Sequence, residues 1–147
     1  MTELNSQELA EVACNILETI VFAFTEPLEG IPSFNSEKFL TAEVSFEGIH
    51  SGLMTLTAPE SLCQEWADMM STQKTETIHL DTLAELANII AGHWVSRQFS
   101  DRELPKLNPP RVSATSIEQW KKIQEAESVA TLSVDSLPLI LSATVSN

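Results

Sequence analysis

The chain has 147 residues, of which 43% are hydrophobic, and its formal net charge is −13. This length predicts one domain, 1–147, that can bury a full hydrophobic core, and the ordinary apolar content favours a globular chain over a disordered one. Lys38 is the only basic residue before Lys74. Because no basic stripe is present to neutralise phosphates, we expect no binding of nucleic acid.

No apolar run approaches the roughly 20 residues that a membrane helix needs, and the first residues are acidic where a signal peptide would be basic. We therefore expect no membrane contact and predict a cytoplasmic location. Cys14 and Cys63 are predicted to be reduced thiols, because each lies in a helical pattern outside any CxxC motif. The three histidines are scattered, so no metal site is expected.

The first predicted element is a helix over Ser6–Phe24, with Ser6 as a candidate N-cap. Its apolar residues follow the spacing of one helical face. They are Leu9, Val12, Ala13, Ile16, Leu17, Ile20, Val21 and Phe24. The segment Thr25–Ser36 contains two prolines and a glycine and is predicted to be a loop.

Strict alternation of apolar and polar residues over 40–47 predicts a half-buried strand. A turn at Gly48 and a second alternating segment around Met54 and Leu56 predict an antiparallel hairpin. A second helix is predicted from Pro59 to about Met70. Its inward residues are predicted to be Leu62, Trp66, Met69 and Met70.

A long helix is predicted over Leu80–Phe99, whereas three prolines exclude a continuous helix over 101–110. The segment 111–114 suggests a short strand. Ser116, with Gln119 three residues later, suggests the capped start of a short helix to Glu125. Two closing strands are predicted over 129–134 and 139–145, joined by 135–138. The fold class is therefore α+β, an antiparallel sheet of hairpins with long amphipathic helices packed on it.

The long helix carries the most informative pattern. At about 100° per residue its polar residues fall on the side opposite the apolar stripe. They are Asp81, Glu85, Asn88, Gly92 and Ser96. Glu85 and Asn88 are three residues apart and should be neighbours on one exposed face.

Gly92 is unexpected on this face, since glycine inside a helix costs about 1 kcal/mol relative to alanine. It removes bulk one turn beyond Asn88, where a partner molecule could approach. It could equally let another element of the same domain pack closely. The residues alone leave both interpretations open.

The pattern Asp81-x3-Glu85-x2-Asn88-x3-Gly92 resembles the signature of the CheC/CheX family of chemotaxis phosphatases. The stretch ELANIIAG (85–92) is similar to that signature, and the strand-turn-strand-helix before it resembles the segment leading into the motif. CheC-type members carry two such helices. Here the first helix has Asn15 and Glu18 in the reverse order, so the resemblance implies the CheX-like branch with one site in each chain.

The resemblance implies a phospho-aspartate phosphatase acting on a CheY-like receiver domain that carries Mg²⁺. Asn88 would orient a water molecule for attack on the phosphoryl group, since an amide has donors and an acceptor and no charge. Glu85 would pair with the active-site lysine of the receiver. Asp81, Gly92 and Ser96 would contact the partner. This chain would supply no cofactor or metal ligand, and a homodimer is expected from the family.

Two other functions stay open from the sequence. The first is a module of the same fold that binds response regulators without hydrolysis. The second is a small-ligand-binding domain in which the polar helix face is internal. His93, next to Gly92, is expected to be a solvated residue.

Overall fold

The computed structural model describes residues 6–30, 32, 38–70, 75–99 and 103–146. Within these ranges the chain forms four helices and a seven-stranded antiparallel sheet, which confirms the predicted α+β class. The helices are α1 (Ser6–Ile20), α2 (Glu60–Met70), α3 (Ile78–Gln98) and α4 (Ile117–Gln124). The strands are β1 (Thr25–Pro27), β2 (Phe39–Glu47), β3 (Ser51–Pro59), β4 (Lys106–Leu107), β5 (Arg111–Ala114), β6 (Ser128–Val134) and β7 (Leu137–Ser146).

The sheet is built around two hairpins. Its strand order is β1-β6-β7-β3-β2-β4, and β5 pairs with a second part of β2. The β6–β7 hairpin closes with Asp135 and Ser136, which have φ of 49° and 70°. Two positive φ angles are typical of the tight turn that matches the twist of paired strands.

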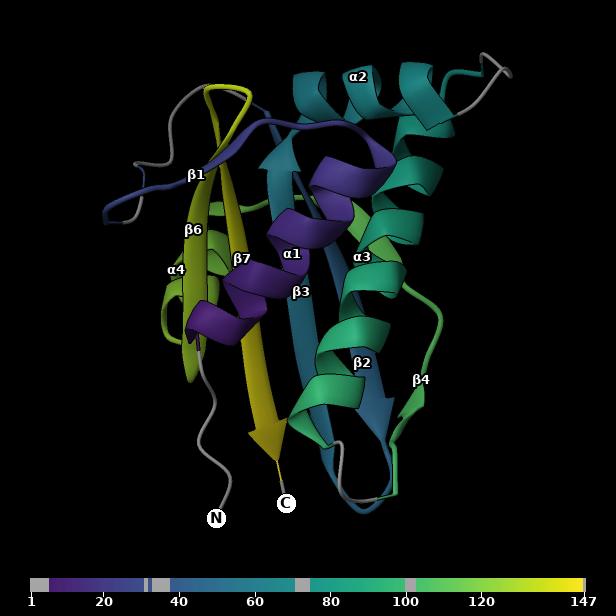
Figure 1. The fold of residues 1–147 in the computed structure, drawn as a ribbon, viewed down its shortest axis with the longest axis vertical. Helices are drawn as coiled ribbons and strands as arrows, with labels where there is room; N and C mark the ends of the chain where they lie inside the picture. The colour runs from purple at the N-terminus through teal and green to yellow at the C-terminus, as the bar shows by residue number, and fades with distance from the viewer. Residues whose placement is uncertain (1–5, 31, 33–37, 71–74, 100–102, 147) are drawn as a thin grey trace.

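Helices cover the two faces of the sheet unequally. Figure 1 shows α1 and α3 side by side on one face, and α2 across one end of the sheet. The main core lies between these helices and inward residues of β2 such as Val44 and Phe46. A second, smaller core lies under α4 on the other face. It consists of Phe39, Trp120, Ile123 and Ile140.

The short helix α4 begins as the sequence predicts. Ser116 is its N-cap, and the Ser116 side chain accepts a hydrogen bond of 3.1 Å from the Gln119 backbone N–H. With eight residues, α4 is about 12 Å long, whereas the ten residues of β7 extend about 33 Å. The helix therefore covers only part of its face of the sheet.

The end of the first helix is predicted wrongly. The helix α1 stops at Ile20, Phe22 has a positive φ of 54°, and Phe24 is 67% exposed rather than inward. The Phe24 N–H donates to the Asp135 carboxylate, and the Asp135 N–H donates to the Phe24 carbonyl. Because of these two hydrogen bonds to the β6–β7 turn, the chain leaves the direction of α1 and continues along the edge of the sheet.

Two further details at the first helix differ from prediction. Thr25–Pro27 forms the edge strand β1 and is not part of a loop. Ser6 lies inside the first turn of α1, and its hydroxyl contacts the Ser128 hydroxyl at 3.0 Å. Of the predicted loop to Ser36, residues 31 and 33–36 lie outside the described residues.

The start and the rotation of α2 also differ from prediction. Pro59 is the last residue of β3, where it pairs with Phe39, and the helix begins at Glu60. Met69 is 59% exposed. The buried stripe consists of Leu62, Cys63, Trp66 and Ala67.

The remaining elements agree with prediction apart from their ends. The helix α3 spans Ile78–Gln98 against a predicted Leu80–Phe99. The strand β5 is confirmed, whereas β4 was not predicted. The turn of the last hairpin is two residues shorter than predicted, because β7 begins at Leu137.

Candidate functional site

The helix α3 buries one face against the sheet and α1. It has 21 residues, so it is about 31 Å long, and it packs along β2 and β3 on one side of the sheet. Its buried residues repeat every three or four positions. They are Thr82, Leu83, Leu86, Ala87, Ile90, Ala91, Trp94 and Val95.

The opposite face of α3 carries the residues that the sequence motif singles out. Asp81, Glu85, Asn88 and Ser96 are exposed, and Gly92 is half-buried. They recur every three or four residues, so they form one stripe along the helix. The structure therefore places all five predicted site residues on one outward surface, named here the α3 face.

Glu85 and Asn88 are available to a partner molecule. They lie about 4.5 Å apart along the helix axis, within one turn. Neither side chain has a hydrogen bond or ion pair with the described residues of the chain. A small-ligand-binding domain with an internal polar helix face would require both side chains to be buried. The structure therefore contradicts that alternative function.

The environment of Gly92 separates the two interpretations left open by the sequence. A Cβ atom at this position would meet only Leu107 Cδ1, at 3.8 Å, within the described structure. That distance is an ordinary van der Waals contact, so packing of β4 against α3 does not require glycine. Within the described residues, the structure therefore does not support the interpretation that Gly92 is needed for close packing inside the domain.

Polar contacts with neighbouring helices hold both ends of α3. Near its start, His79 Nε2 lies 3.1 Å from a carboxylate oxygen of Glu60 in α2. Near its end, Arg97 contacts Glu8 at 3.3 Å and Glu11 at 3.4 Å, both in α1. These pairs were not predicted, because each joins residues far apart in the sequence. They tie the ends of α3 to its neighbours while leaving the centre of the α3 face open.

Metal ligands and the cysteine thiols are two further groups of candidate residues for chemistry outside the α3 face. Among the described residues, no three His, Cys, Asp or Glu side chains are grouped to hold a metal ion. Burial, and then the charge of Glu60, raise the pKa of the Cys63 thiol to about 12. Cys63 is therefore protonated at neutral pH and is a poor nucleophile. His93 is exposed, as expected for a solvated residue.

The comparison with protein families identifies the chain. Residues 40–132, which include Glu85 and Asn88, match the family model described as chemotaxis phosphatase CheX. None of the curated proteins matches the sequence. In the described part of the chain, no helix is both long enough and apolar enough to cross a membrane.

Solved structures share the fold. The chemotaxis protein CheX from Vibrio vulnificus superposes with a TM-score of 0.72 at 15% identity, covering 95% of both chains. CheX from Desulfovibrio desulfuricans gives a TM-score of 0.67 at 14% identity, covering 96% of this chain and 98% of that one. The CheX–CheY–BeF3–Mg complex from Borrelia burgdorferi gives a TM-score of 0.65 at 16% identity, covering 96% and 97%.

These chemotaxis proteins share the α+β fold of this chain, whose α3 face exposes an acid and an amide. Because the family match extends over more than half of the sequence, the chain belongs to the CheX family of chemotaxis phosphatases.

Proposed function

We propose that the chain hydrolyses the phospho-aspartate of a CheY-like receiver domain, with Asn88 and Glu85 as the residues that act on the partner. The observation that supports this assignment is the exposure of both side chains on the α3 face, without internal partners in the described structure. The related Borrelia burgdorferi protein was crystallised with CheY, which supports a receiver domain as the partner.

The proposed chemistry suits an amide at position 88. Phosphoryl transfer depends mainly on positioning and on charge stabilisation. In this proposal Mg²⁺ is held by the receiver and neutralises the phosphoryl oxygens. The Asn88 carboxamide orients the attacking water, because it both donates and accepts hydrogen bonds and carries no charge. This chain then needs neither a metal ligand nor a covalent intermediate.

Glu85 has a different task in the proposal. Its carboxylate pairs with the active-site lysine of the receiver and sets the register of docking. Asp81 and Ser96 extend the contact along the α3 face. Gly92 lets the partner backbone approach the helix.

The test is release of phosphate from a phosphorylated receiver. Wild-type chain should accelerate it, whereas Asn88→Ala should lower the rate at least ~100-fold, because the water loses its orienting group. Asn15→Ala is the matched control, since it removes an exposed asparagine from α1 instead.

The non-catalytic module makes the opposite prediction. Equal phosphate release with wild-type chain and Asn88→Ala, together with unchanged receiver binding, would contradict a catalytic role for Asn88. It would favour a binding module of the same fold.

The assembly belongs to the same proposal. We propose that residues 1–147 form one domain, that it acts in the cytoplasm, and that it forms a homodimer. The resemblance to the CheX family is the ground for the homodimer. A monomer mass by light scattering at assay concentrations would contradict the dimer.

A further inference from the structure

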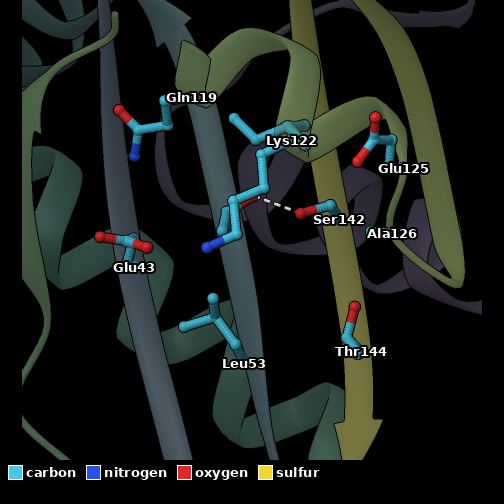
Figure 2. Close-up of a pocket in the computed structure, with 10 residues that line it drawn as sticks. Glu43, Leu53, Gln119, Lys122, Glu125, Ala126, Ser142 and Thr144 are labelled. Atoms are coloured by element: carbon cyan, nitrogen blue, oxygen red, sulfur yellow. Dashed lines mark hydrogen bonds between the residues drawn. The ribbon is translucent and has the colours of Figure 1, made fainter.

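A cavity of about 270 Å³ opens on the face of the sheet opposite α3, beneath the last turn of α4 (Figure 2). It exists because α4 is too short to cover the strands beneath it. The residues of the α3 face do not line it. The proposed phosphatase function therefore does not account for this cavity.

The floor of the cavity is a row of polar residues across three strands. Glu43 lies opposite Thr55, and Thr55 lies opposite Ser142. The Thr55 and Ser142 hydroxyl oxygens are 2.5 Å apart, and each residue is only 4% exposed. Two hydroxyls carry two protons, of which only one lies in their shared hydrogen bond. The second O–H has no acceptor among the described residues, so it is available to an acceptor in the cavity.

Lys122 and Glu43, which carry opposite charges, both line the cavity. Figure 2 shows Lys122 reaching from α4 over β3, with its Nζ on the side of Glu43. Neither Lys122 nor Glu43 forms an ion pair within 4.0 Å in the described part of the chain. The cavity thus presents one ammonium group, the two carboxylates of Glu43 and Glu125, and one spare hydroxyl proton. Glu43 is the carboxylate on the side of the Lys122 Nζ.

The remaining walls are partly apolar, with Leu53 from β3 and Ile123 from α4. The volume is slightly below the ~300–1,000 Å³ of sites for drug-sized ligands, which favours a small molecule over a nucleotide or a peptide. A small molecule that matches Lys122, Glu43 and these apolar side chains carries a negative group, a positive group and a short apolar group close together.

We propose that this cavity binds a small apolar α-amino acid. Its carboxylate is received by the Lys122 ammonium and by the spare hydroxyl of the Thr55–Ser142 pair. Its ammonium group pairs with Glu43. Its side chain packs against Leu53 and Ile123.

The experiment titrates the ¹⁵N-labelled full chain and follows its amide chemical shifts. The probes are L-valine, isovalerate, which lacks the ammonium group, and isobutylamine, which lacks the carboxylate. L-valine should shift amides near Thr55, Ser142 and the end of α4 saturably in the millimolar range. The two single-charge probes should bind at least ~10-fold more weakly, because each leaves one protein charge unpaired.

Single-residue variants test which side chains bind L-valine. Lys122→Met and Glu43→Gln should each weaken L-valine binding at least ~10-fold. Lys121→Met is the matched control, since it removes the same charge from an exposed neighbour outside the cavity and should leave binding unchanged. The native amide spectrum of each variant checks its fold.

Three results would overturn the proposal. They are the absence of saturable shifts at tens of millimolar L-valine, an equal response to all three probes, and equal weakening by Lys121→Met and Lys122→Met. Asn88→Ala should bind L-valine like the wild-type chain, so failure of the phosphatase assignment would be recognised separately.

Discussion

The helices α1 and α3 lie side by side on one face of the sheet, and each exposes a glutamate and an asparagine three residues apart. In α1 the Glu18 carboxylate accepts a hydrogen bond from the Thr25 hydroxyl at 2.5 Å. In α3 Glu85 has no such bond to the described residues. The same residue types therefore have different surroundings on neighbouring helices.

The other acidic residues of α1 point to the same difference. Glu8 and Glu11 both contact Arg97 at the end of α3. Three carboxylates of α1 bond to other parts of the domain, whereas Glu85, at the centre of the α3 face, has no such bond to the residues that the structure describes. The two helices therefore differ in which carboxylates remain available to a partner, and not in residue type.

The largest expected effect comes from adding a charge at the amide. Asn88→Asp preserves the side-chain size but sets a carboxylate beside the phosphoryl group, where like charges cost several kcal/mol. Phosphate release should fall more than ~100-fold, since each 1.36 kcal/mol is a factor of ten in rate. Asn15→Asp adds the same charge to α1 and should leave the rate unchanged. Equal rates of phosphate release for Asn88→Asp and Asn15→Asp would contradict a special role for the asparagine of α3.

Charge reversal at the glutamates should have the next largest effect. Glu85→Lys is expected to raise the receiver concentration for half-maximal rate by ~10–100-fold, because it faces the receiver lysine with a like charge. Steady-state kinetics over a range of receiver concentrations measures this change. Glu18→Lys should leave those kinetics unchanged and only lower the thermal midpoint slightly, through loss of the Thr25 bond. Identical kinetics for Glu85→Lys and wild-type chain would argue against docking through Glu85.

Gly92→Ala should separate stability from function. It is expected to stabilise the fold by up to ~1 kcal/mol, which raises the thermal midpoint by ~2–4 °C, since the added Cβ makes only an ordinary contact with Leu107. Receiver binding should weaken several-fold, as measured by calorimetry. The comparison on α1 is Ala10→Gly, which should lose stability by a similar amount without weakening binding. Unchanged receiver affinity for Gly92→Ala would show that the partner does not approach this position.

The smallest effect is expected at the contact between the two helices. Arg97→Met removes both ion pairs to α1, but Arg97 is 45% exposed, and such surface pairs contribute about 0.2–1 kcal/mol each. Thermal unfolding at low salt should show a fall of a few degrees that disappears in ~1 M salt, where the charges are screened. Phosphate release should not change, and a large loss would mean that Arg97 positions α3 for docking.

Much of the fold follows from local patterns. The two central hairpins, the long helix and the Ser116 cap agree with prediction, because each pattern is repeated over several residues or depends on one local hydrogen bond. Edge elements were missed. The strands β1 and β4 have three and two residues, too few to show a period. The end of α1 depends on Asp135, more than a hundred residues away in the sequence.

The candidate site also has features that the sequence predicts and features that it does not. The 3.6-residue period of α3 by itself determines that Glu85 and Asn88 face outward, since the apolar residues between them must face the core. Whether an outward carboxylate is free or bonded depends on which segment the chain brings beside it. Only the tertiary structure decides that Arg97 meets Glu8 and Glu11, that Leu107 touches Gly92 loosely, and that a charged cavity remains under α4. Contacts of this kind join residues far apart in the chain, and local periodicity carries no information about their distance in space.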